Sequence, residues 1–211
     1  MIVIAFYTKN YEKYANNLRN QLEDLGIKND IVEVGLEEYM KERPESCNKK
    51  HWITRSAPMF IKQMYERYPD EDLFYIHADA AVRKNIRFTI EKDDAVLVSE
   101  GCGIPIWMKP KNLKTDVIGA PLFIRHCQRS EIFLEDYLKK VRDDDRNVGE
   151  QVILSEVVQD VGEVVKINYF RERVAVNALK IPVELNIMGQ AVRFSIITQN
   201  AVQYFDPMVV V

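Results

Sequence analysis

The sequence predicts a single-domain α/β protein with an open, mixed and mainly parallel sheet flanked by helices. Two observations predict it. Apolar runs of strand length recur at 2–7, 30–34, 73–76 and 95–99, and segments with apolar residues at helical spacing separate the first three of them. Alternating strands and helices are typical of an open sheet, whose ligands bind beyond the carboxyl ends of its strands.

The first strand, helix and strand form one such unit. The strand "IVIAFY" at 2–7 is followed by a helix that ends at Gly26, a residue suited to a helix C-cap, and "DIVEV" at 30–34 is the next strand. The apolar positions of that helix are Tyr11, Tyr14, Ala15, Leu18, Leu22 and Leu25.

A second helix is predicted after the polar stretch 41–50. It begins near Ser56 and Pro58, because proline is favoured in a first helical turn, and Pro69 lies just beyond its end. The strands "LFYI" at 73–76 and "AVLVS" at 95–99 follow. The apolar face of the helix consists of Phe60, Ile61, Met64, Tyr65 and Tyr68.

The second half alternates less regularly. A strand is predicted at 119–126, then a helix capped by Ser130, a solvated turn at 142–146 and a further helix from about 150 to 158. From Val164 onward the pattern is rich in strands, whose order the sequence leaves open. No repeat or linker interrupts the chain, so one domain is expected over 1–211.

Composition narrows the function classes. The formal net charge is −3 and the pI about 5.7, which argues against a protein that mainly grips nucleic-acid backbones, although a local basic groove stays compatible with it. No apolar run approaches the roughly 20 residues of a membrane span, and no signal peptide is evident. Cys47, Cys102 and Cys127 are widely spaced and indicate neither a disulfide framework nor a zinc site. A cytoplasmic protein is expected.

Familiar nucleotide and catalytic motifs are missing from the sequence. The first strand runs into "FYTKN" instead of G-x-G-x-x-G, which argues against a common dinucleotide fold. The chain has no P-loop lysine motif, no glycine-rich start of the sugar nucleotidyltransferase kind and no evident Ser, His and Asp set.

The strand at 73–76 runs into two polar residues. His77 and Asp79 are two positions apart, so in an extended chain they share one face. One interpretation is a ligand or metal site at the end of the strand. The other is that Asp79 caps a turn while His77 is a hydrogen-bonded core residue.

Several segments, in order, resemble the small GT-A glycosyltransferases, including a bacterial and phage group of about this length. They are "FYT" after the first strand, "WITRSAPMFI" at 52–61, "HADAAV" at 77–82, "IGAPLFIRHCQRSEIFLEDYL" at 118–138 and "GEQVIL" at 149–154. The resemblance covers about three quarters of the chain. It implies one GT-A-like nucleotide-sugar-binding domain, with 1–100 as its donor-binding half and 101–211 as its acceptor-side half.

In that family a D-x-D motif at a strand end holds a divalent cation, which neutralises charge on the departing nucleoside diphosphate. Here the motif reads His77-Ala78-Asp79. The resemblance therefore implies a site for Mn²⁺ or Mg²⁺ at Asp79 and His77. Because imidazole suits manganese and is a poor ligand for magnesium, manganese is expected.

The resemblance also implies contacts to the donor. Tyr7 and Thr8 lie where the family cradles the nucleoside, and a plain strand-end turn is the alternative. Trp52 and Arg55 precede the helix that lies near the donor. Arg55 is expected to pair with a phosphate or else to be an exposed surface arginine. Ala57 stands where the family has a lysine.

The segment "GEQVIL" resembles the family's Asp-Gln-x-x-Leu element. The resemblance makes Glu150 the candidate general base or acceptor contact and Gln151 a donor contact. The alternative is that Glu150 only complements the dipole of a first helical turn. A C-terminal histidine of the family falls near Thr198. Four of the family's functional positions are thus altered, at His77, Ala57, Glu150 and Thr198.

We therefore expect a metal-dependent glycosyltransferase that takes a nucleotide-diphosphate sugar as donor. The acceptor, whether a glycan, a protein, a lipid or a modified base, is not specified by the sequence. The alternative is a catalytically degenerate domain that binds a nucleotide sugar or serves as an assembly module. A transferase for modified bases in DNA is a third and weaker interpretation, because the pI is acidic.

Overall fold

The computed structural model describes residues 1–82, 86, 88–100, 110–170, 176–177, 180–187, 190–197 and 202–204. Its helices are η1 (Lys9–Tyr11), α1 (Glu12–Asp24), α2 (Leu36–Met40), α3 (Lys49–Arg55), α4 (Ala57–Arg67), α5 (Gln128–Asp143) and α6 (Glu150–Val165). Its strands are β1 (Ile2–Tyr7), β2 (Asn29–Glu33), β3 (Leu73–Tyr75), β4 (Ala80–Val82), β5 (Val96–Glu100), β6 (Val117–Ile124), β7 (Ile167–Tyr169), β8 (Val176–Asn177), β9 (Lys180–Ile187), β10 (Gln190–Ile197) and β11 (Val202–Tyr204).

A six-stranded sheet with the order β2-β1-β3-β6-β5-β7 forms the centre of the molecule. β1 runs parallel to both β2 and β3, and β5 runs parallel to β7. β6 is antiparallel to its two neighbours, β3 and β5. The predicted open, mixed sheet flanked by helices is therefore confirmed.

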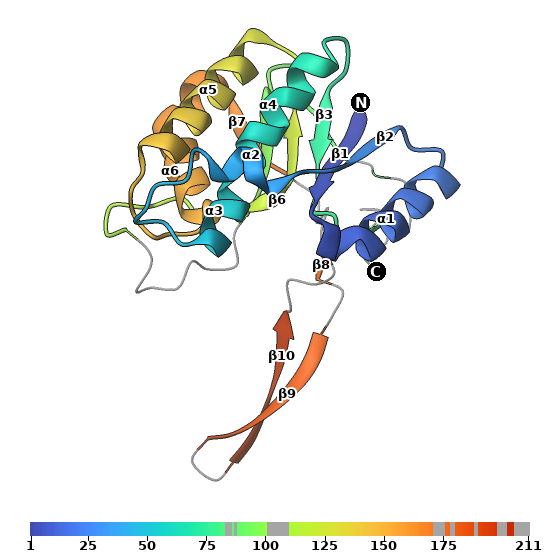
Figure 1. Ribbon diagram of the computed structural model, residues 1–211, viewed down its shortest axis with the longest axis vertical. Coiled ribbons are helices and arrows are strands. Elements are labelled where there is room, and N and C mark those ends of the chain that lie inside the picture. Colours follow the sequence, from blue (N-terminus) through green and yellow to red (C-terminus); the bar gives the residue numbers. More distant parts are fainter. Residues whose placement is uncertain are drawn as a thin grey trace.

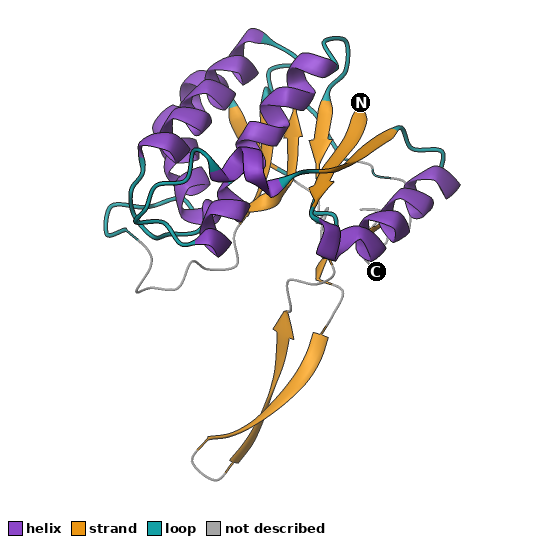
Figure 2. Cartoon of the chain, viewed as in Figure 1, coloured by secondary structure: helices purple, strands orange, loops and turns teal. Residues whose placement is uncertain are grey.

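Helices cover the sheet on both faces (Figures 1 and 2), with α4, α5 and α6 on one side and α1 on the other. The alternation of strand residues separates the two cores, because neighbouring residues of a strand point to opposite faces. In β3, Leu73 and Tyr75 join the core under α4, α5 and α6, while Phe74 joins the core on the α1 side. The continuous apolar runs that predicted these strands are thus runs buried on both faces.

Local signals account for several element boundaries. Gly26 ends α1 with a φ of +67°, the left-handed conformation expected of a glycine C-cap. α4 carries Pro58 in its first turn, as predicted. Among the apolar positions at helical spacing, Tyr11 and Tyr14 lie at the surface, about two-fifths exposed, with their ring centroids 5.8 Å apart.

Other boundaries depend on tertiary contacts and were not predicted. The helices α2 and α3 occupy a region that sequence analysis left without elements. α5 begins at Gln128, so Ser130 lies inside the helix, where its hydroxyl donates to the carbonyl of Ala95 at 3.0 Å. The turn expected at 142–146 is only partly solvated, because the side chain of Asp144 is 6% exposed and pairs with Arg146.

The strands after β7 form two smaller units. β11 pairs in parallel with β4 and antiparallel with β8, and β9 pairs with β10 in a hairpin that extends from the body in Figure 1. Within the part of the chain that the structure describes, no helix is both long and apolar enough to cross a membrane.

Candidate functional site

His77 and Asp79 follow the carboxyl end of β3, the third of the six strands. The backbone pairing continues one residue past the strand, since the N–H of Ile76 donates to the carbonyl of Ile4 at 3.0 Å. A turn comes next, in which the N–H of Ala80 donates to the carbonyl of His77 at 3.0 Å. Both polar residues therefore lie at the sheet edge where open α/β folds bind ligands.

Burial determines the charge of these two side chains. Desolvation lowers the pKa of His77 to about 4 and raises the pKa of Asp79 to about 6. His77 is partly exposed, and at neutral pH its imidazole is neutral, while Asp79 is mostly ionised although only 8% exposed. Asp79 forms no ion pair with any residue that the structure describes.

His77 and Asp79 are residue types that bind divalent cations. Among the described residues, no three His, Cys, Asp or Glu side chains are grouped as a metal site. A carboxylate oxygen and a neutral imidazole nitrogen fit a transition metal such as manganese better than magnesium. A cation held by these two residues alone would take its further ligands from water or from a diphosphate.

Tyr7 ends β1 and Thr8 follows it, at the same edge of the sheet, because β1 and β3 are parallel neighbours. Tyr7 is 8% exposed and packs in the core on the α1 side, which leaves little of its ring open to a ligand. Thr8 is partly exposed and makes no side-chain cap to the short helix that follows. Of the two residues, Thr8 is the more accessible.

Glu150 is the first residue of α6 and is 8% exposed. The hydroxyl of Tyr137 donates to its Oε1 at 2.9 Å. The other neighbour is the backbone of Gly119, where an added Cβ would lie 2.8 Å from Oε2. Desolvation raises the pKa of Glu150 to about 7, so that both its protonated and ionised forms are present near neutral pH.

Gln151 follows on α6 and is partly exposed. Its Nε2 donates to Oδ1 of Asp116 at 2.9 Å, just before β6 begins. Because β6 is antiparallel to β3, its amino end lies at the same sheet edge as the carboxyl end of β3. The structure therefore brings Glu150 and Gln151 to the edge that carries His77 and Asp79.

Trp52 and Arg55 make their contacts inside the fold. Trp52 is fully buried, and its Nε1 donates to the carbonyl of Tyr39 at 2.6 Å. Arg55 is also fully buried, and its guanidinium donates to the carbonyls of Asp144, Arg146 and Val148.

These contacts hold Trp52 and Arg55 inside the fold, and the donor-binding roles expected of them stay predictions. Arg55 is not an exposed surface residue, and its N–H groups bind backbone carbonyls instead of a phosphate. Trp52 has no ring face open for a nucleoside. Ala57, the position where the family has a lysine, lies at the start of α4 and is buried as well. Thr198 lies outside the described residues.

Sequence analysis missed the partners of Glu150. Tyr137 falls within the helix predicted after Ser130, and Gly119 begins the predicted strand 119–126. Neither position carries a local signal, because the contact joins residues from β6, α5 and α6 that meet only in the folded protein.

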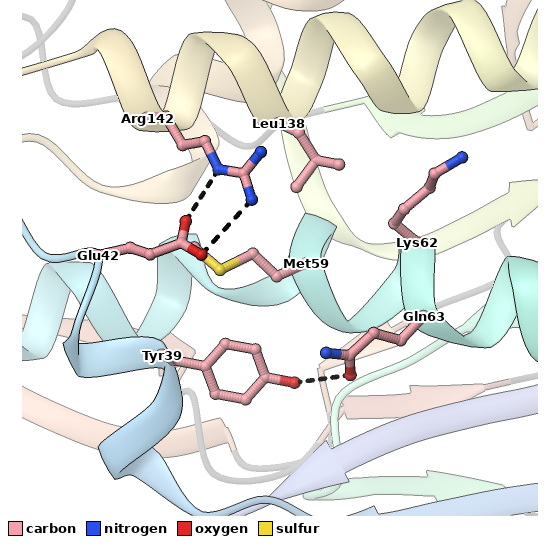
Figure 3. Close-up of a pocket in the computed structure, with 7 residues that line it drawn as sticks. All are labelled: Tyr39, Glu42, Met59, Lys62, Gln63, Leu138 and Arg142. Atoms are coloured by element: carbon pink, nitrogen blue, oxygen red, sulfur yellow. Dashed lines mark hydrogen bonds and ion pairs between the residues drawn. The ribbon is translucent and has the colours of Figure 1, made fainter.

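A surface cavity of about 160 Å³ lies elsewhere, between α2, α4 and α5. Figure 3 shows Arg142 paired with Glu42 on one side of this cavity and the hydroxyl of Tyr39 directed at Gln63 on another. Its remaining lining residues are Met59, Lys62 and Leu138. None of the site residues predicted from the sequence lines it.

Comparison with known proteins places the fold. No family model matches the chain, and no curated protein does. The chain is similar to the crystal structure of a glycosyltransferase involved in the glycosylation of the major capsid of PBCV-1, with a TM-score of 0.53 and 14% sequence identity over 80% of this chain and 79% of that one. A second structure, the apo form of the glycosyltransferase GlyE of Streptococcus pneumoniae TIGR4, has a TM-score of 0.45 and 12% identity over 75% of this chain and 43% of that one. The first likeness shows that this chain has a glycosyltransferase-like fold.

Proposed function

We propose that this chain is a glycosyltransferase that moves a sugar from a nucleotide-diphosphate sugar to an acceptor, with a divalent cation at Asp79 and His77. One observation carries the proposal. A neutral imidazole and a buried carboxylate stand at the carboxyl end of a central strand, in a sheet with a glycosyltransferase-like fold. Ligands of open α/β sheets bind at that edge.

Glycosyl transfer involves three changes in the substrates. The bond from the sugar C1 to the diphosphate oxygen breaks, a bond from C1 to an acceptor oxygen forms, and the acceptor gives up a proton. A cation, when bound, stabilises charge on the departing nucleoside diphosphate. Asp79 and His77 are the residues that would hold it, and Thr8, partly exposed after β1, would contact the nucleoside.

Glu150 is the candidate for the acceptor side. A general base is most effective when its pKa lies near the working pH, and burial brings the pKa of Glu150 to about 7. The same carboxyl group can instead orient the sugar or the acceptor by hydrogen bonding. The first role requires the ionised form, and the second is open to both forms.

The test combines binding and turnover. We expect a nucleoside diphosphate with manganese to raise the melting temperature, and the matching nucleotide sugar to release nucleoside diphosphate in the presence of an acceptor. Asp79→Ala should abolish both responses, whereas Asp93→Ala, at a carboxylate that is 80% exposed, should change neither. Failure of every nucleotide and metal combination to stabilise the wild type would contradict the proposal.

A degenerate nucleotide-sugar-binding or assembly module is the second candidate. The burial of Arg55 and Trp52 favours it, because both residues expected to grip the donor are used inside the fold. Turnover separates the candidates. The module is expected to be stabilised by nucleotide without releasing nucleoside diphosphate from any nucleotide sugar, with or without an acceptor.

A further inference from the structure

Tyr137 and Glu150 form a buried polar pair between two helices. Tyr137 lies within α5 and is fully buried, while Glu150 opens α6. The tyrosine hydroxyl donates to Oε1 of Glu150 at 2.9 Å. Because an unpaired polar group is costly in the interior, this hydrogen bond fixes where the carboxyl group lies.

Gly119 closes the other side of the carboxyl group. A Cβ at this position would lie 2.8 Å from both Cδ and Oε2 of Glu150 and 2.9 Å from Oε1. Real Cβ atoms do not approach other atoms so closely, so only glycine leaves room for the carboxyl group. The group is therefore held between one hydroxyl and one stretch of bare backbone.

We propose that Tyr137 is a positioning residue for Glu150, and that its hydroxyl, opposite the bare backbone of Gly119, holds the Glu150 carboxyl in the orientation that glycosyl transfer requires. This inference rests on the proposed function. Tyr137 acts through Glu150 and need not touch the substrate.

The groups around the pair predict how loss of the Tyr137 hydroxyl changes the pKa of Glu150. Among the titratable and charged groups around it, Tyr75 on β3 acts on Tyr137. Arg55 on α3 binds the carbonyl of Val148, two residues before Glu150, and Asp116 before β6 binds Gln151, the residue after it. Burial raises the pKa of Glu150 to about 7, and the hydrogen bond from Tyr137 opposes that rise. Removing the hydroxyl therefore raises the pKa of Glu150 further and frees the carboxyl group to rotate.

The experiment compares Tyr137→Phe with Tyr65→Phe. Tyr65 is a matched control, since it is 2% exposed and its hydroxyl donates to the carbonyl of Cys127 at 2.9 Å. We expect Tyr137→Phe to lower kcat about tenfold or more with KM nearly unchanged, and to move the Glu150-dependent limb of the pH profile to higher pH. Tyr65→Phe should leave both within about twofold of wild type.

A double variant tests whether Tyr137 acts through Glu150. If it does, Tyr137→Phe combined with Glu150→Gln loses no more kcat than Glu150→Gln alone. Multiplicative losses, or equal effects of the two tyrosine variants, would overturn the inference.

If the wild-type protein shows no turnover, the proposed function is refuted. The role of Tyr137 is then tested by carbon-13 NMR titration of the Glu150 carboxyl group in the absence of substrate. A higher pKa in Tyr137→Phe than in wild type supports the contact. Identical titration curves overturn it.

Discussion

Nε of Arg55 donates to the carbonyl of Val148 at 2.8 Å, across 93 residues of the chain. The same guanidinium binds the carbonyls of Asp144 and Arg146, so one side chain of α3 holds the loop that leads into Glu150. Asn48, at the start of α3, adds a second tie, because its Nδ2 donates to Oδ1 of Asn147 at 2.7 Å. The helix that carries Trp52 and Arg55 thus fixes the loop before the candidate catalytic residue.

Arg55→Ala should destabilise the protein strongly. It leaves buried carbonyls unpaired and removes the positive charge beside Asp144, which should cost about 3–5 kcal/mol of unfolding free energy. Arg55→Lys should recover only part of this loss, because an ammonium group cannot reach three carbonyls at once. Denaturant unfolding measures both effects.

Arg129→Ala is the control for charge removal, since Arg129 is more than a third exposed and its pairing with Asp93 is long, at 3.7 Å. It should cost no more than about 0.5 kcal/mol. Equal stabilities of the Arg55 and Arg129 variants would contradict a loop-holding role for Arg55.

Gly119→Ala should displace the Glu150 carboxyl. The new methyl group would meet that carboxyl at 2.8 Å, so the side chain must rotate and give up the hydrogen bond from Tyr137. We expect a stability loss of about 1–3 kcal/mol together with a fall in turnover. Gly35→Ala, where no atom lies within 4 Å of the new methyl group, should be nearly neutral. A crystal structure of Gly119→Ala with the Glu150 carboxyl unmoved would refute this account.

Glu150 should make the stability of the fold depend on pH. Burial raises the folded-state pKa from 4.5 to about 7, so the contribution of Glu150 is complete below about pH 4.5 and is lost as the pH rises through 7. At about 1.4 kcal/mol per pKa unit, the loss is on the order of 3–4 kcal/mol.

The measurement is the difference in unfolding free energy between wild type and Glu150→Gln at pH values from 4 to 8. Subtracting the variant cancels the contributions of other groups, such as His77 and Asp79. The difference should decline steadily across the window from pH 4.5 to 7. A difference that stays constant with pH is incompatible with a Glu150 that is buried and protonated.

His77→Asp should change which metal the protein prefers. The variant replaces an imidazole with a second carboxylate, a hard oxygen ligand suited to magnesium. With a nucleoside diphosphate present, magnesium should then raise the melting temperature at least as much as manganese does, whereas manganese should be the more effective of the two in the wild type. His51→Asp on α3 adds a carboxylate elsewhere and should leave the preference unchanged. An unaltered preference in His77→Asp would remove His77 from the metal site.

Much of the fold was predictable from local sequence. The apolar runs at 2–7 and 73–76 specified strands buried on both faces, because alternating strand residues face opposite layers, and Gly26 specified the end of α1. The position of His77 and Asp79 followed in the same way, since a polar pair after a buried run marks the end of a strand. These features depend only on residues that are near one another in the chain.

Only the tertiary structure decided the roles of Arg55, Tyr137 and Gly119. The local sequence does not indicate whether an arginine is exposed or buried. The burial of Arg55 depends on backbone carbonyls about 90 residues away in the chain. The carboxyl group of Glu150 acquires its raised pKa from burial between β6 and α5, which no local pattern encodes. The sequence by itself determined which residues end the strands and begin the helices, while packing between distant segments decided which of them lie buried and which stand at the sheet edge.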